Sequence, residues 1–429
     1  MQRTGTTKLS IGIVAALCMA LGSGLAVYAT SASAAPTSKD ASAAADSAAK
    51  DAAATPEPDE FGVVTAEQWK DIYPNEYATY MENEANSPDS GKHNYLELYP
   101  ALPTMYKGYG FAKGYDEASS HLYTLESVKA TPRVNEKTLA NCITCKTPQF
   151  TNTVNTEGDQ VYAEPFADMI SKYTEPVSCF NCHENDPQSL TIASKFFVNS
   201  LGDDVDKAPA ESEVCGQCHN EYYFDPDTKA TSNPYTGLAA MNPDDILAYY
   251  NEMGFKDWEH PDTGAAMIKV QHPEFETLYG GDTQPTMIKA GYTCADCHMA
   301  ATKADDGTEF ASHNWVSPLE NEQLLADNCS KCHEDLASEV KAIQDEEETR
   351  VTAISEKIED LVNQAAAKKA DGSLAGDDLA KVQDLQRTAQ FYWDFVMVEN
   401  SEGAHNPDLT FDTLDKSEAA VDEALAMLA

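Results

Sequence analysis

The chain of 429 residues has little positive charge. It contains 29 lysine and arginine residues against 71 aspartate and glutamate residues, which gives a formal net charge of -42 at pH 7. Nucleic acids and acidic membrane surfaces attract basic proteins, so this balance excludes a general binder of either kind. A small anionic substrate would need a local positive region, and we expect the acidic surface to serve solubility or a basic redox partner.

The sequence also has no cysteines left for a disulfide framework. Ten of its 11 cysteines form five C-x-x-C pairs, and only Cys18 lies outside them. Four pairs are followed directly by histidine. This is the pattern of c-type haem attachment, in which two thiols form thioethers to the porphyrin and the histidine ligates the iron. The four motifs are Cys179–Cys182–His183, Cys215–Cys218–His219, Cys294–Cys297–His298 and Cys329–Cys332–His333.

The first pair, Cys142 and Cys145, is followed by Lys146 instead of histidine. Lysine can ligate iron only as the neutral amine, so coordination must lower its pKa. This substitution sets the first haem apart and makes it the place where we expect chemistry. Zinc ribbons use two pairs in one small unit without an adjacent histidine, and thioredoxin-type pairs occur singly in a βαβ context that is absent here. The sequence therefore predicts five covalently bound haem c groups.

A long apolar run occurs only near the N-terminus. Basic residues precede an apolar stretch at 11–28, which is followed by an Ala-Ser-Ala cleavage site. Residues 1–34 are therefore predicted to be a signal peptide or an uncleaved membrane anchor, and both remain open. Either one exports the protein to the periplasm or to the outer face of the cytoplasmic membrane. Export suits c-type haems, because these are attached outside the cytoplasm. Residues 35–60, rich in Ala, Ser and Asp, predict a disordered tether.

The rest of the sequence predicts an all-α multihaem cytochrome with little β structure. Residues 61–333 hold all five motifs and predict loops and short helices, as expected when cofactors rather than sheets fill the core. Residues 334–429 carry apolar side chains at steps of three and four, the stripe of long amphipathic helices, with a break at 371–373. We expect these C-terminal helices to share a domain with the haem region. For their apolar faces, ordinary core packing and a dimer interface both remain open.

Histidine is scarce, and its number limits the iron ligands. The chain has ten histidines, of which four stand in the motifs. Four electron-transfer haems with two histidine ligands each need four more, since two strong-field nitrogens hold a low-spin iron with little reorganisation. Two histidines then remain, one of them available to a catalytic pocket. The six histidines outside the motifs are His93, His121, His260, His272, His313 and His405.

Three stretches of the sequence form a joint pattern. They are Cys142-Ile-Thr-Cys-Lys146, Val214-Cys-Gly-Gln-Cys-His-Asn-Glu-Tyr-Tyr-Phe224 and Met267-Ile-Lys-Val-Gln-His-Pro-Glu274. This pattern resembles the ammonia-forming cytochrome c nitrite reductases, and the resemblance extends over residues 61–429. It implies a six-electron reduction of nitrite to ammonium at a lysine-ligated haem, with four bis-histidine haems that deliver the electrons.

The resemblance also implies the residues of the site, with Lys146 as the proximal ligand of the catalytic haem. The open face of that haem would be lined by Arg133, Tyr222 and His272, with Lys129 as the alternative cation to Arg133. A calcium ion beside the pocket would be held by Glu221, Gln271 and the carbonyls of Tyr222 and Lys269. The distal ligands of the other haems would be His121, His260, His313 and His405, which leaves His93 as the non-ligand.

By the same resemblance, the C-terminal helices form a homodimer interface, and a quinol-linked multihaem cytochrome donates the electrons. Two other functions are open. A pure electron-transfer cytochrome would have six-coordinate iron at every haem and no use for Lys146. A sulfite-reducing relative would also take an anion through six electrons, whereas an octahaem relative would need more than the five pairs present. Hydroxylamine and nitric oxide are further substrates that the sequence leaves open.

Overall fold

The computed structural model describes residues 55–86, 94–115 and 120–429. The predicted signal or anchor segment, most of the predicted tether and His93 lie outside these residues. Among the helices that the model describes, none is both long and apolar enough to cross a membrane. The strands in the described ranges form three short antiparallel ribbons, and helices, turns and loops make up the rest. The prediction of an all-α fold with little β structure is confirmed.

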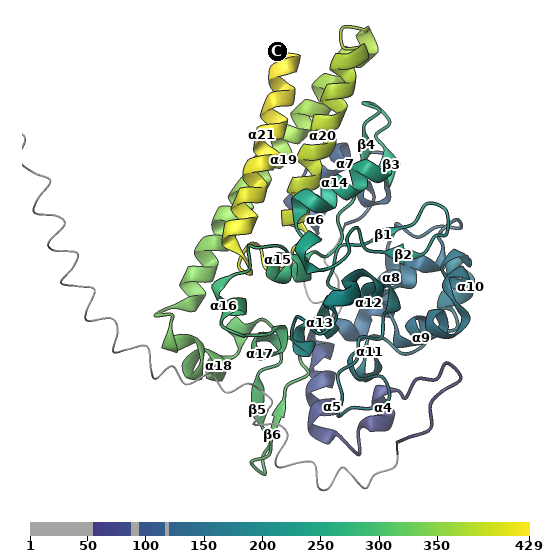
Figure 1. The fold of residues 1–429 in the computed structure, drawn as a ribbon, viewed down its shortest axis with the longest axis vertical. Helices are drawn as coiled ribbons and strands as arrows, with labels where there is room; N and C mark the ends of the chain where they lie inside the picture. Colours follow the sequence, from purple (N-terminus) through teal and green to yellow (C-terminus); the bar gives the residue numbers. More distant parts are fainter. Residues whose placement is uncertain (1–54, 87–93, 116–119) are drawn as a thin grey trace, which may run out of the picture.

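Short helices and the three ribbons form the body of the molecule (Figure 1). Its α-helices are α4 (Ala66–Trp69), α5 (Pro74–Met81), α6 (Tyr95–Leu98), α7 (Leu102–Met105), α8 (Thr124–Ala130), α9 (Pro148–Glu157), α10 (Phe166–Ile170), α11 (Cys179–His183), α12 (Lys195–Leu201), α13 (Ala210–Gly216), α14 (Pro243–Met253), α15 (Glu274–Tyr279), α16 (Thr286–Lys289), α17 (Cys294–His298) and α18 (Glu322–Asp327). Its 3-10 helices are η1 (Glu82–Asn86), η2 (Gly110–Ala112), η3 (His121–Tyr123), η4 (Ala140–Ile143), η5 (Asp159–Ala163), η6 (Gly202–Asp204), η7 (Leu238–Ala240), η8 (Pro318–Glu320) and η9 (Cys329–Lys331). The ribbons pair β1 (Tyr223–Phe224) with β2 (Thr231–Ser232), β3 (Trp258–Glu259) with β4 (Ala266–Met267), and β5 (Ala301–Lys303) with β6 (Glu309–Ala311).

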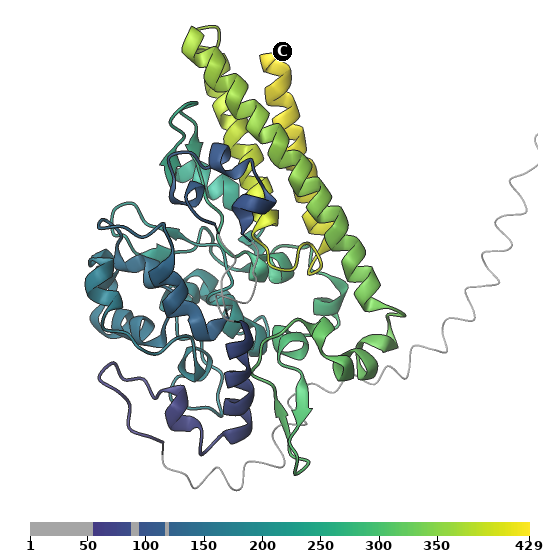
Figure 2. The same ribbon diagram turned by 180° about the vertical axis from the view of Figure 1, so that it is seen from behind.

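Three long helices stand beside the body as a column that ends at the C-terminus, as both ribbon views show (Figures 1 and 2). They are α19 (Leu336–Asp371), α20 (Gly376–Met397) and α21 (Pro407–Leu428). The Asp335 side chain caps α19 by accepting the N–H of Ser338. Gly372, with a φ of 83°, ends the helix in the left-handed conformation that glycine adopts without steric cost. The break predicted at 371–373 is therefore confirmed.

One apolar core joins this column to the body. It extends from Tyr99 to Leu428 and takes in the buried stripes of all three long helices. At its centre Trp393 is fully buried, and its Nε1 donates a hydrogen bond to the Val351 carbonyl at 2.8 Å. The Tyr99 ring meets the Trp393 ring edge-on at 6.0 Å. The long helices therefore hold one side of the haem-motif region in place.

Candidate functional site

All five C-x-x-C pairs begin within a helical turn. They start in η4, in α11, at the end of α13, in α17 and in η9. In α11 and α17 the helix contains the whole motif, and residues three and four positions apart lie on one side of a helix, so both thiols and the histidine face one way. In the first motif, η4 ends at Ile143 and Cys145 has a φ of 63°. All ten of these cysteines lie in the described residues, and none of them forms a disulfide. This local geometry fits covalent haem attachment at each pair.

The motifs are also neighbours in space. The Cys145 and Cys218 thiols are close enough to hydrogen-bond, which lowers the pKa of Cys145 and raises the pKa of Cys218. A hydrogen bond from Cys215 likewise lowers the pKa of Cys294 to about 6. The first motif therefore adjoins the third, and the third adjoins the fourth. Adjacent attachment sites of this kind would place their haems in a continuous row.

Three motif histidines face a second histidine that comes from a distant part of the chain. The ring centroids are 6.2 Å apart for His121 and His219, 6.4 Å apart for His183 and His313, and 6.1 Å apart for His298 and His405. An imidazole nitrogen binds a transition metal at about 2.0 Å, so two imidazoles on opposite sides of one metal ion have their ring centres about 6 Å apart. Each of the three pairs would fit the two axial ligands of one haem, and the His272 ring is a second neighbour of His219 at 6.3 Å.

Hydrogen bonds at Nδ1 orient four of these six rings, those of His183, His298, His313 and His405. The Nδ1 atoms of His183, His298 and His313 lie 2.7, 3.0 and 2.9 Å from backbone carbonyls. Burial lowers the pKa of His298 and of His313 to about 4, which keeps both in the neutral form that ligates metals. Burial would also lower the pKa of His405, but Glu399, 2.6 Å from its Nδ1, raises it to about 9. A carboxylate in that position makes an imidazole a stronger ligand.

His260 does not take part in this arrangement. It is fully buried, with its Nε2 at 2.9 Å from the Thr104 carbonyl oxygen and its Nδ1 at 3.4 Å from the Thr263 N–H. It follows strand β3, which lies at the height of the long helices, whereas α18 and the fifth motif lie at the opposite end of the molecule in Figure 1. The structure thus gives His260 hydrogen-bond partners at both ring nitrogens and does not place it opposite a motif histidine.

Arg133, Tyr222 and His272 come together beside the first motif. Burial raises the pKa of Tyr222 well above its ordinary value, the nearby Cys145 raises it further, and Arg133 acts in the opposite direction. Burial lowers the pKa of His272 to about 3, and the charge of Lys146 adds to this shift. Each of the three side chains is therefore within electrostatic reach of the motif that ends in lysine.

Arg133 and His272 each have nitrogen atoms that make no hydrogen bond within the described part of the protein. The Nε of Arg133 donates to the Thr131 hydroxyl at 2.9 Å, and the guanidinium lies over the Phe111 ring at 4.2 Å. Within the described ranges, no other guanidinium nitrogen of Arg133 makes a hydrogen bond. The buried Nδ1 of His272 likewise has no partner in the described part of the chain. Lys129, the alternative cation, is exposed at the end of α8. The site is thus arranged for a small polar ligand beside Arg133.

The residues predicted to hold calcium form one buried cluster. Glu221 accepts the Gln271 backbone N–H at 2.5 Å, and the Gln271 side chain donates to the Lys269 carbonyl at 3.0 Å. Burial raises the pKa of Glu221 well above its ordinary range. Glu276 accepts the Glu221 N–H at 2.8 Å. Burial raises the pKa of Glu276 to about 8. A carboxylate, an amide oxygen and backbone carbonyls are hard oxygen ligands of the kind that calcium prefers. The positive charge of a calcium ion would also stabilise the charged forms of Glu221 and Glu276.

A buried ion pair ties this cluster to the long helices. The Lys269 Nζ lies 3.0 Å from Asp394 Oδ1 on α20, and the other oxygen of Asp394 accepts the Val270 N–H at 2.8 Å. Lys269 is 2% exposed and Asp394 is fully buried. Asp394 belongs to no motif, and its only sequence signal is a carboxylate within the apolar stripe of a helix. Asp394 therefore holds in place the backbone segment that leads to Gln271 and His272.

Known proteins are similar to this chain over most of its length. Residues 65–429 match the family model of cytochrome c552. The cytochrome c nitrite reductase subunit NrfA of Nitratidesulfovibrio vulgaris is 32% identical over 408 residues, which cover 83% of this chain and 77% of that protein. A cytochrome c-552 of Parabacteroides distasonis is 29% identical over 366 residues, covering 80% of this chain and 72% of that protein.

A solved structure has the same fold. The cytochrome c nitrite reductase of Desulfovibrio desulfuricans ATCC 27774, described for two calcium sites in its catalytic subunit NrfA, matches with a TM-score of 0.77 and 27% identity over 86% of each chain. The predicted resemblance is confirmed by these matches. The chain belongs to the cytochrome c552 family, together with relatives that are cytochrome c nitrite reductases.

Proposed function

We propose that this protein reduces nitrite to ammonium, taking six electrons per nitrite, at a haem attached to Cys142 and Cys145 with Lys146 as its proximal ligand. The observation that carries the proposal is the convergence of Arg133 and His272 on the one motif that ends in lysine. The names of the relatives support nitrite as the substrate. A haem with one open face would bind the substrate nitrogen and supply it with electrons.

The protein's own residues would bind and orient the anion. Arg133 offers a planar, positively charged set of N–H donors, and its contacts with Thr131 and Phe111 hold the guanidinium in one orientation. His272, with a pKa of about 3, is neutral near pH 7, so it donates an N–H hydrogen bond to a substrate oxygen rather than a charge. Tyr222 keeps its phenol proton because its pKa is raised, and it can donate to later intermediates.

The histidine pairs would serve the electron supply. Reduction of nitrite to ammonium consumes six electrons and eight protons, so a single haem cannot complete it from its own store. Paired imidazoles at His183–His313, His121–His219 and His298–His405 suit low-spin haems that change little on reduction. The contact between Cys145 and Cys218 would bring such a haem next to the catalytic one.

The calcium ion is also part of the proposal. Glu221 and the Gln271 side chain, with the carbonyls of Tyr222 and Lys269, would hold it. Its charge would stabilise the buried carboxylates of Glu221 and Glu276 and would make the pocket locally attractive to an anion in an otherwise acidic chain.

The cellular setting is proposed from the sequence. We infer export through residues 1–34, a homodimer formed through the long helices, and a quinol-linked multihaem cytochrome as the electron donor. The apolar stripes of α19 to α21 are largely used within the protomer, so the proposed dimer contact would use their outer faces.

Ammonium production from nitrite by the haem-loaded protein, with a reduced viologen as electron donor, tests the proposal. Wild type should form ammonium in proportion to nitrite consumed. Lys146→His and Arg133→Ala should be much slower, whereas Lys129→Ala, which removes an exposed cation of the same region, should match wild type. A protein with reducible haems that forms no ammonium would instead be an electron carrier.

A further inference from the structure

The haem motif at Cys329 and Cys332 differs from the other three histidine motifs because its histidine, His333, has no second histidine ring opposite it in the described part of the chain. His333 is oriented like them, since its Nδ1 lies 2.6 Å from the Glu339 carboxylate in the first turn of α19. This hydrogen bond turns Nε2 towards a metal. In the described part of the chain, however, no histidine ring faces His333, whereas each of the other three motif histidines has a partner ring about 6 Å away.

The histidines described by the structure are all accounted for elsewhere. Six of them form the three pairs, and His272 lies in the pocket of the first motif. His260 is hydrogen-bonded through both nitrogens, and it directly follows β3, which lies far from α18 in Figure 1. The second ligand of a haem at His333 must therefore come from another residue type or from outside the described residues.

The short helix α16 places a methionine near this motif. The Met287 carbonyl accepts the Tyr292 N–H at 3.1 Å, so a tight turn joins α16 to the segment that enters α17. Partial burial raises the pKa of Tyr292, and charges on Cys332, Cys297 and Cys329 raise it further, which puts Tyr292 beside the fourth and fifth motifs. Figure 1 draws α16 next to α17 and α18.

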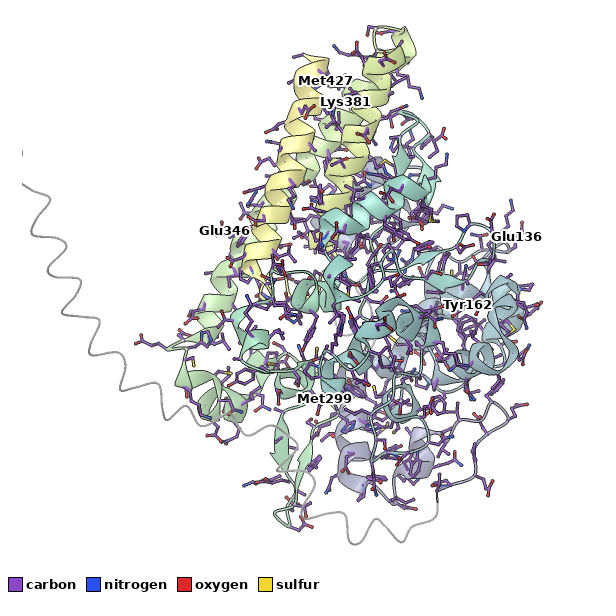
Figure 3. The ribbon with its side chains drawn as sticks, in the orientation of Figure 1. Glu136, Tyr162, Met299, Glu346, Lys381 and Met427 are labelled. Carbon is purple, nitrogen blue, oxygen red and sulfur yellow. The ribbon has the colours of Figure 1, made fainter. Side chains whose placement is uncertain are left out.

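The Met287 side chain is oriented away from the protein core. Ile288 packs against the apolar core, and neighbouring residues of a helix point about 100° apart. Met287 is accordingly 38% exposed. Other exposed methionines lie far from the motif: Met253 ends α14, and Met427 is at the tip of the column in Figure 3.

Two further side chains of the region are weaker candidates. Lys289 on the same helix is exposed, and as a hydrated ammonium it would have to lose its proton before it could bind iron. Met299 directly follows His298 and is half-buried beside the fourth motif (Figure 3). A neutral, polarizable thioether is by contrast an established haem ligand opposite histidine.

We propose that Met287 is the second axial ligand of the haem at Cys329, Cys332 and His333, so that this haem has histidine–methionine ligation. The inference rests on the proposed haem attachment but not on the substrate. Methionine opposite histidine raises the reduction potential of a haem c. This haem, at the end of the row that is farthest from the first motif, would hold an electron more tightly than the histidine-paired haems do.

Spectroscopy of the full haem-loaded protein tests the ligand. The ferric wild type should show a far-red thioether-to-iron charge-transfer band of a strength that corresponds to one haem. Met287→Ala should abolish the band and lower the midpoint potential of one haem, and Met287→His should replace it by a bis-histidine spectrum. The control variants Met253→Ala, Met299→Leu and Lys289→Ala should keep the band.

Several results would overturn the assignment. The first is a protein with five haems that shows no thioether band. The second is a band that survives in Met287→Ala or is lost in Met299→Leu. The third is a His93→Ala variant in which one low-spin haem becomes high-spin. A haem count of four would refute the attachment on which the inference rests. If the band behaves as expected but no ammonium forms, the ligand assignment holds and only the proposed reaction fails.

Discussion

Loss of the Asp394 carboxylate should both destabilise the protein and loosen the site. Burial raises the pKa of Asp394 and lowers the pKa of Lys269, so each charge is costly in this place and persists because of the other. Removing one partner of a buried pair costs about 3–5 kcal/mol, because the remaining charge has no counter-charge. Asp394→Ala also leaves the buried Val270 N–H without its acceptor, which adds about 1–3 kcal/mol.

Urea unfolding followed by far-ultraviolet circular dichroism measures this loss as a lower midpoint at an unchanged slope. Asp394→Asn should lose less than Asp394→Ala, since the amide oxygen still accepts the Val270 N–H. The double variant Lys269→Met/Asp394→Leu should recover most of the loss, because a well-packed apolar pair is often as stable as a buried ion pair. A loss below about 1 kcal/mol in Asp394→Ala would refute the account of a buried, mutually dependent pair. Calcium affinity should fall in the same variant, since Lys269 and Gln271 flank Val270.

Three further predictions concern charge. Burial, with Glu402 and Glu399 nearby, raises the pKa of Glu347 to about 8, above its value in the unfolded chain, so folding stability should fall as pH rises towards 8. Glu347→Gln should flatten that dependence in urea melts at pH 5 and pH 8, and an equal slope in both proteins would contradict the assignment. Glu221→Gln should weaken calcium binding by calorimetry at least tenfold, whereas Glu252→Gln on the exposed face of α14 should not. Glu399→Gln removes the carboxylate at His405 Nδ1 and should raise the midpoint potential of one haem in a redox titration; an unchanged set of potentials would exclude this tuning role.

The sequence alone determined those features whose information is local. A thiol pair and the ligand after it lie within five consecutive residues, so the five motifs, and the exceptional Lys146, can be identified without a structure. The long C-terminal helices follow from the apolar stripe, and the residues at 371–373 end the first of them because Gly372 takes a left-handed conformation. The grouping of Arg133, Tyr222 and His272 followed from the resemblance of the motifs.

Only the tertiary structure decided which distant side chains meet. Neither the order of histidines along the chain nor their number shows that His260 is hydrogen-bonded inside the protein while His313 reaches His183. Asp394 carries no motif, yet it fixes the segment that contains Lys269 because a helix near the C-terminus packs against the site. Axial ligands and buried counter-charges depend on contacts between segments far apart in the chain, and these contacts exist only once the core has formed.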